Sequence, residues 1–186
     1  MMVGSPSALQ LPASSAALAG LRVGDELRLY GTIYTMRDAG HVRALEHLQA
    51  TGELPYDLAG QALFYAGPSE PAAGRPFGAI GPTTASRMDF ATPALLRAGI
   101  TVTLGKGPRS PEVRAACAQT GSVYLAAVGG AAALLASHVT AALLVAWSDL
   151  GPEALRRLTL EGLPAFVAID AQGNDLFQQG RGGDEC

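Results

Sequence analysis

The chain has 186 residues, of which 48% are apolar and 16% charged, and its net charge is −3. This composition is typical of one globular domain rather than of a disordered chain. The small negative charge argues against nucleic acid or an anionic membrane as a partner, and no apolar run reaches the roughly 18 residues of a membrane span.

The cysteine and histidine content gives no metal signature. Cys117 and Cys186 form neither a disulfide framework nor a CxxC motif. They are too few to supply the thiolates that hold an iron–sulfur cluster, so we predict that this chain alone binds none. The histidines are scattered, and we predict no metal ligand. Reduced cysteines and an N-terminus without a basic signal segment favour a cytoplasmic protein.

Strands and helices alternate along most of the chain. We predict a flexible extension at residues 1–20, a single domain at 21–179 and a flexible tail at 180–186. In chain order, the predicted elements are strands at 26–30 and 32–36, a helix that Asp38 caps and Gly52 ends, strands at 62–65 and 77–80, a helix at 92–99, a strand at 100–104, a helix that begins at Ser110, a strand at 123–128, a helix or turn at 129–137, a buried strand at 141–147, a helix at 152–158, a strand at 165–170 and a turn at 171–174. This alternation predicts an α/β fold with a largely buried sheet.

Three segments concentrate polar residues between the apolar strands. They are GTIYTMRDAGH at 31–41, GPTTASRMD at 81–89 and GKGPRS at 105–110. Each lies where a predicted strand ends and a helix is about to begin. Ligands of α/β proteins bind at the ends of strands, so these segments are the candidate site.

Each segment contributes one cation: Arg37, Arg87 and Lys106. Three converging cations would suit a small dicarboxylate, because the planar fork of arginine gives a carboxylate two parallel hydrogen bonds. A solvated surface charge is the plain interpretation of each residue taken alone. The lysine segment is not a phosphate-binding Walker A loop, since Ile100 replaces the first glycine of that motif and Gly107 replaces its Ser or Thr.

Two further polar residues have more than one interpretation. His41 lies one helical turn from Arg37 and Asp38, where it could orient Arg37, touch a substrate or be an ordinary first-turn histidine. Cys117 lies among alanines and is interpreted as a packing residue.

Taken together, the three segments resemble the β domain of the iron–sulfur hydro-lyases, the family of class I fumarases and L-tartrate dehydratases. The likeness includes Arg-Asp-Ala-x-His at 37–41, Gly-Pro-Thr-Thr-x-x-Arg-Met-Asp at 81–89 and Gly-Lys-Gly at 105–107, and it extends from about residue 21 to residue 177. It implies a swivelling β/β/α domain that closes over a catalytic partner. In two-subunit members that partner is an α subunit, in an α2β2 heterotetramer, and it carries a [4Fe–4S] cluster with one iron open to substrate.

The resemblance implies a hydro-lyase β subunit that is active only with its α subunit. The implied reaction is the reversible hydration of fumarate to malate. The alternatives are an L-tartrate dehydratase β subunit, which would yield oxaloacetate, and a noncatalytic domain that kept the fold. By the same likeness, Arg37, Arg87 and Lys106 hold the substrate carboxylates and Thr83 is the base, with help from a carboxylate on the other subunit.

The same resemblance suggests supporting roles for Asp38, His41, Thr84 and Ser86. Thr84 is expected to be a helix cap or turn residue. Ser86 stands where the family often has glycine, and it would be strained if that glycine has a positive φ.

Overall fold

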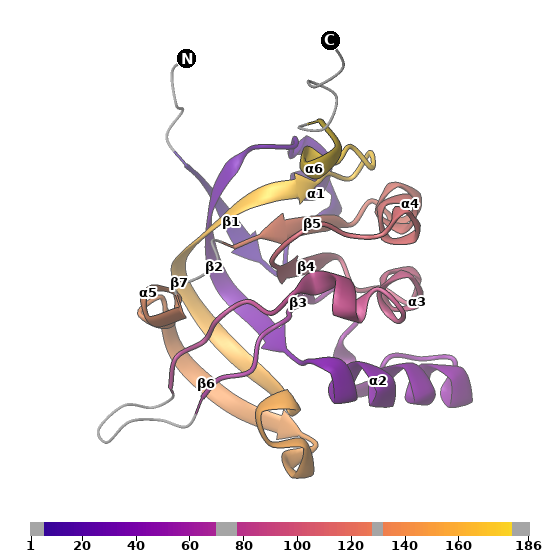
Figure 1. The fold of residues 1–186 in the computed structure, drawn as a ribbon, viewed down its shortest axis with the longest axis vertical. Helices are drawn as coiled ribbons and strands as arrows, with labels where there is room; N and C mark the ends of the chain where they lie inside the picture. The colour runs from indigo at the N-terminus through magenta and orange to yellow at the C-terminus, as the bar shows by residue number, and fades with distance from the viewer. Residues whose placement is uncertain (1–5, 70–77, 128–131, 180–186) are drawn as a thin grey trace.

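The computed structural model describes residues 6–69, 78–127 and 132–179 (Figure 1). Short 3-10 helices are labelled η. The elements in chain order are β1 (Ser7–Leu11), α1 (Ser15–Gly20), β2 (Glu26–Thr35), α2 (Asp38–Thr51), η1 (Pro55–Asp57), β3 (Ala62–Phe64), η2 (Ala85–Met88), α3 (Thr92–Arg97), β4 (Val102–Gly105), α4 (Pro111–Thr120), β5 (Val123–Ala126), α5 (Ala132–Ala136), β6 (Val139–Ala146), η3 (Ser148–Glu153), β7 (Leu155–Ile169) and α6 (Leu176–Gln179).

The strands form a closed mixed barrel. β2, β3, β4 and β5 are parallel neighbours, and β7 runs antiparallel to both β5 and β2, which closes the ring. β1 pairs with β2 outside the ring, and β6 pairs with β7. The structure therefore confirms the predicted α/β class and shows that the sheet is mixed. The closure joins strands far apart in the sequence, and local patterns did not predict it.

The barrel has two apolar layers. Residues alternate along each strand, so Leu29 and Phe64 belong to one hydrophobic cluster, and Leu63 and Tyr124 belong to another. The second cluster also contains residues of α3 and α4, such as Val113. Figure 1 shows α2, α3 and α4 on one side of the barrel strands. β2 leads into α2, and β4 leads into α4, on this side.

β2 was predicted as two strands, one on each side of Gly31. The two predicted segments form one strand whose pairing with β7 shifts between Leu29 and Tyr30, where Gly162 is the extra residue on the β7 side. Gly31 has a φ of 90°, and a Cβ there would lie 2.2 Å from the carbonyl oxygen of Leu11. Glycine is therefore required where β1 lies against β2.

Most of the segment predicted as an N-terminal extension is folded. β1 pairs with β2, and Ser14 caps α1 by accepting a hydrogen bond from Ala17 N–H. Leu9, Leu11 and Leu18 are buried in the hydrophobic cluster that contains Leu29. The abundance of Ala, Ser and Gly had suggested a loose segment, but three leucines at inward positions attach it to the barrel. The predicted tail at residues 180–186 lies outside the described residues.

We expect Leu18→Ala to lower the free energy of unfolding by about 2–4 kcal/mol, because Leu18 is only 2% exposed. Urea denaturation of the purified chain measures this loss. Leu143→Ala is the matched control, since Leu143 is 54% exposed and its truncation opens no cavity. Equal effects of the two substitutions would contradict the packing of α1 described above.

Three other predicted elements differ from the structure. Residues 78–80 of the strand predicted at 77–80 form no strand: Gly78 N–H and the carbonyl of Ala79 bond to the backbone of Ser69, and residue 77 lies outside the described residues. The segment predicted as a helix at residues 152–158 forms the end of η3 and the start of β7. Leu155 and Leu158 have helix-like spacing, but in β7 they lie in different hydrophobic clusters, and both are buried. The strand predicted as buried at 141–147 is largely exposed, since β6 has only β7 as a neighbour.

Candidate functional site

The three polar segments meet at one edge of the barrel. β2, β3 and β4 are parallel, so their carboxyl ends lie together, and the segments follow these ends. Backbone hydrogen bonds join the two later segments: Ala85 N–H donates to Lys106 O at 2.9 Å, and Lys106 N–H donates to Thr83 O at 3.2 Å. Thr83 N–H donates to Tyr65 O, just after β3, at 2.7 Å.

Arg87 links the second segment to the first. Its Nη2 donates to Asp38 Oδ2 at 2.7 Å, and its Nη1 donates to Thr83 Oγ1 at 3.4 Å. Asp38 was predicted to cap α2, but it is the first helical residue, and its side chain binds Arg87 instead. The Arg87 side chain is 47% exposed, so the pair adds little stability, and its main effect is to orient the guanidinium.

Arg37 is held at both its backbone and its side chain. It is the N-cap residue of α2, and its carbonyl accepts hydrogen bonds from His41 N–H at 2.8 Å and from His41 Nδ1 at 2.9 Å. Glu153 Oε1 lies 3.8 Å from Arg37 Nη2, while Glu153 Oε2 accepts the Ala39 N–H at 2.7 Å. Glu153 was absent from the predicted site residues. Its signal in the sequence was a Glu-Ala pair that follows the family pattern.

The His41 ring is fully buried against Tyr65, with ring centroids 5.1 Å apart. Burial, with a smaller contribution from the charge of Arg109, lowers the pKa of His41 from 6.5 to about 4, so His41 is neutral at physiological pH. Neutral His41 donates Nδ1–H to Arg37 O. His41 therefore orients Arg37, one of the interpretations left open by the sequence.

We expect His41 to make the unfolding free energy depend on pH. The folded pKa lies below the unfolded one, so this stability is present above about pH 6.5 and is lost as pH falls toward 4. Wild-type protein should lose roughly 2 kcal/mol more than His41→Asn between about pH 7 and pH 4.5, in urea titrations. Parallel losses in the two proteins would show that His41 does not titrate in this way.

Thr84, Ser86 and Lys106 complete the predicted set. Thr84 stands at the N-cap of η2, but its side chain makes no capping hydrogen bond. Ser86 lies within η2 and is not among the described non-glycine residues with positive φ, so its backbone does not have the strain that was considered for this position. Lys106 is exposed and, within the described residues, pairs with no carboxylate. A Cβ at the preceding Gly105 would lie 2.9 Å from Ala85 Cβ, so glycine lets the two segments approach.

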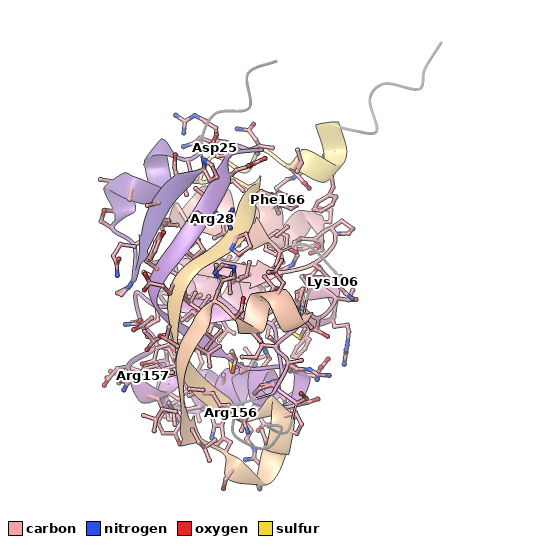
Figure 2. The ribbon with its side chains drawn as sticks, turned by 90° about the vertical axis from the view of Figure 1, so that its left-hand side faces the viewer. Asp25, Arg28, Lys106, Arg156, Arg157 and Phe166 are labelled. Carbon is pink, nitrogen blue, oxygen red and sulfur yellow. The ribbon has the colours of Figure 1, made fainter. Side chains whose placement is uncertain are left out.

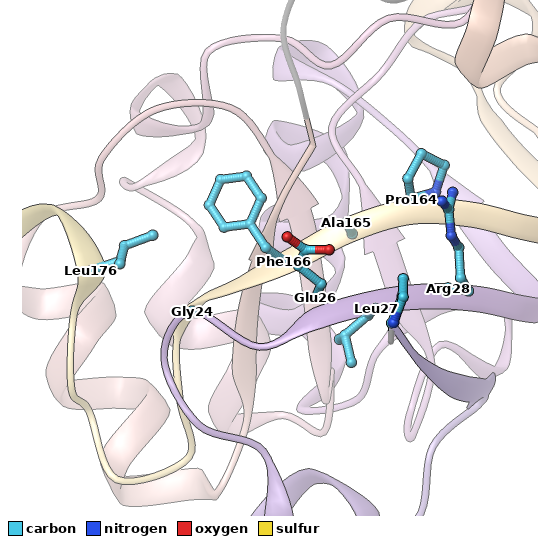
Figure 3. A pocket seen from close by; sticks show the side chains of 9 residues that line it. Gly24, Glu26, Leu27, Arg28, Pro164, Ala165, Phe166 and Leu176 are labelled. Carbon is cyan, nitrogen blue, oxygen red and sulfur yellow. The ribbon is translucent and has the colours of Figure 1, made fainter. Parts of the chain in front are cut away.

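Two hollows of the described surface lie away from these residues. One, with a volume of about 470 Å³, is lined by Glu26, Arg28, Phe166 and Leu176 at the amino end of β2 (Figure 3). In Figure 2, Lys106 lies at the periphery, away from Arg28 and Phe166. A second hollow, of about 680 Å³, lies between α2 and Trp147. Neither of these two hollows contains a predicted site residue.

The described residues do not fit an iron–sulfur cluster. No group of three His, Cys, Asp or Glu side chains within residues 6–69, 78–127 and 132–179 is placed to hold a metal. Burial raises the pKa of the Cys117 thiol to about 12, which keeps it protonated, and Cys186 lies outside the described residues. No described helix is long and apolar enough to cross a membrane.

Comparisons with known proteins confirm the resemblance. A family profile described as "Fumarase C-terminus" matches residues 6–180. The chain is 42% identical to the anaerobic class I fumarate hydratase of Escherichia coli over 166 residues, which are 88% of this chain but only 30% of that protein. It is 37% identical to a putative L(+)-tartrate dehydratase subunit beta of Methanocaldococcus jannaschii (86% of this chain, 85% of that one) and 33% identical to L(+)-tartrate dehydratase subunit beta of E. coli (93% and 87%).

Proposed function

Since the chain belongs to the fumarase C-terminus family, we propose that it is the β subunit of a hydro-lyase that interconverts fumarate and malate. The observation that carries the proposal is the contact of Arg87 with Thr83, at the barrel edge where Lys106 and Arg37 also lie. Arg87 contacts the Thr83 hydroxyl, and two more cations lie nearby. This arrangement suits a substrate whose carboxylate is held in place while a neighbouring carbon loses its proton.

The cations bind and orient the substrate. Asp38 and Thr83 use two N–H groups of Arg87, and its other donors are available to a carboxylate. Arg37 and Lys106 add two more positive charges. Together they stabilise the negative charge that develops on the carboxylate beside the carbon that loses its proton.

Thr83 takes part in the proton transfer. Its oxygen accepts a hydrogen bond from Arg87, so its own O–H hydrogen is free to be donated elsewhere. The nearby guanidinium also stabilises negative charge on that oxygen. A hydroxyl becomes an effective base only when another group takes its proton, and we assign that acceptor to a carboxylate of the partner subunit.

The cluster belongs to the partner in this proposal. We propose an α subunit that carries a [4Fe–4S] cluster, in an α2β2 assembly. We further propose that this domain swivels and closes its cationic surface, formed by Arg37, Arg87 and Lys106, over the α subunit. Support comes from the cysteines, which do not fit a cluster, and from the exposure of Arg87 and Lys106, which leaves them accessible to a second surface.

Tartrate is the second candidate substrate. Two relatives that the chain covers almost fully are named as tartrate dehydratase β subunits, one of them as a putative one, whereas the anaerobic fumarate hydratase of E. coli shares higher identity over a smaller part of its length. A noncatalytic role is disfavoured, because a scaffold has no need for three cations and a hydroxyl at one edge.

The test is anaerobic co-expression with a cluster-bearing α chain, followed by assays on fumarate, malate and L-tartrate. We expect co-purification and turnover of fumarate and malate that exceeds turnover of tartrate. The isolated chain should show neither a cluster spectrum nor activity. A stoichiometric cluster on the isolated chain, or a copurified cluster-loaded pair inactive on all three substrates, would refute the proposal.

A further inference from the structure

A buried arginine lies beneath the cationic surface. The Arg109 side chain has no exposed area. Its Nε donates to Asp89 Oδ1 at 2.6 Å, and its Nη2 donates to Thr92 Oγ1 at 2.7 Å and more weakly to Tyr65 OH at 3.4 Å. The guanidinium also lies over two aromatic rings, 5.0 Å from the centroid of Tyr65 and 4.8 Å from that of Tyr124. A buried cation this well partnered has one fixed position.

Arg109 lies in the third polar segment, and its partner Asp89 is the last residue of the second. Asp89 is two residues after Arg87, and its other oxygen accepts the Ser110 N–H at 2.7 Å. Asp89 thus joins the end of the second polar segment to the end of the third.

The two aromatic rings extend this network to the other side of the site. Tyr65, which faces Arg109, accepts the Thr83 N–H through its carbonyl. Tyr124 OH donates to the carbonyl of Gly107, the residue after Lys106, at 2.8 Å. His41 packs edge-on against the Tyr65 ring and binds the Arg37 carbonyl. One guanidinium therefore contacts, directly or through one residue, every segment of the site.

We propose that Arg109 is a positioning residue for the hydro-lyase reaction. It fixes the relative positions of Thr83, Arg87 and Lys106 without touching the substrate. The inference rests on the proposed function and adds to it. It states that a buried ion pair, Arg109 and Asp89, holds the substrate-binding residues in position. A shift of about 1 Å in such groups can cost a hundredfold in rate, whereas a purely structural pair would affect only stability.

The test removes the pair and keeps the charge balance. In the reconstituted complex, the double variant Asp89→Asn/Arg109→Met should lower kcat/KM about 100-fold and raise the dissociation constant of succinate, a nonreacting dicarboxylate, about tenfold. Replacing both members of a buried ion pair avoids leaving an unpaired charge, so the variant should fold. The single variant Arg109→Lys should also lose activity, because an ammonium cannot hold Asp89 and Thr92 together in the same geometry.

The matched control is the ion pair between Arg43 and Asp149, whose side chains are 38% and 61% exposed and form no hydrogen bond with Arg109 or its partners among the described residues. Arg43→Met/Asp149→Asn should leave kcat/KM and succinate affinity unchanged. A second variant, Tyr124→Phe, removes only the hydroxyl that binds Gly107 and should lower kcat/KM about fivefold, the cost of one hydrogen bond. If the double variant does not fold, the kcat/KM of Tyr124→Phe decides whether this network positions the site.

The outcomes separate this inference from the proposed function. An inactive wild-type complex would refute the proposed function. An active wild-type complex together with a folded double variant of normal kcat/KM and normal succinate affinity would overturn the positioning role of Arg109. Loss of activity in Arg109→Lys, with a cooperative unfolding transition and weakened succinate binding, would support it.

Discussion

We expect Thr83→Ala to lower kcat of the reconstituted complex by about 10²–10⁴-fold and to leave the melting temperature almost unchanged. The hydroxyl of Thr83 makes one side-chain hydrogen bond among the described residues, the long contact from Arg87, so its removal costs the fold little. The loss should appear in kcat, because proton transfer occurs in the transition state. Steady-state kinetics with malate, alongside thermal melts, measure both quantities.

Neighbouring substitutions sharpen this prediction. Thr83→Ser keeps a hydroxyl and should retain much of the activity. Thr84→Ala is the matched control: Thr84 is exposed and makes no capping bond, so its loss should change stability by less than about 0.5 kcal/mol and alter kcat little. Wild-type kcat in Thr83→Ala would place the base on the α subunit and leave this domain a substrate clamp.

Arg87→Ala should lower kcat/KM about 1,000-fold, the loss of roughly 4 kcal/mol of binding to the charged transition state. Arg87→Lys keeps the charge but loses the planar fork, and kcat/KM should still fall at least about tenfold. The fold should tolerate both changes, because Asp38 remains at the N-terminus of α2, where a carboxylate is stabilised.

Two variants serve as comparisons for Arg87. Arg97→Lys alters an exposed arginine at the end of α3 and should have no kinetic effect. Asp38→Asn should weaken activity less than Arg87→Ala, since it releases the guanidinium without removing it. Normal kcat/KM in Arg87→Lys would mean that Arg87 acts as a point charge or as a bystander.

Local patterns predicted most of the helices and strands. α2 ends at Gly52, whose φ of 79° is the left-handed conformation that glycine adopts easily, and α4 begins with the Ser110 cap and Pro111. The barrel closure was not predictable in this way, since β2 and β7 are far apart in sequence and neither signals its partner. β1 and α1 were missed because small residues obscured the inward leucines.

The predicted site residues come from the three predicted segments, and the structure places these segments together. The residues that hold them were missed. Glu153 reaches the start of α2 from 114 residues away, and Arg109 reaches Asp89 from 20 residues away. A carboxylate or a guanidinium in isolation resembles a solvated charge, and only the fold shows that these two are buried or bonded. Contacts between distant segments have no local pattern to indicate them.

We propose that this chain supplies the cationic half of a hydro-lyase site to a separate cluster-bearing subunit. The most direct test is an anaerobic titration of that α subunit with this chain, with fumarate hydration as the readout. Activity should rise from near zero and saturate at one chain per α subunit. The variant Arg37→Ala/Arg87→Ala/Lys106→Ala should bind equally well without restoring activity. Full activity of the α subunit alone, or full activation by this triple variant, would contradict the claim.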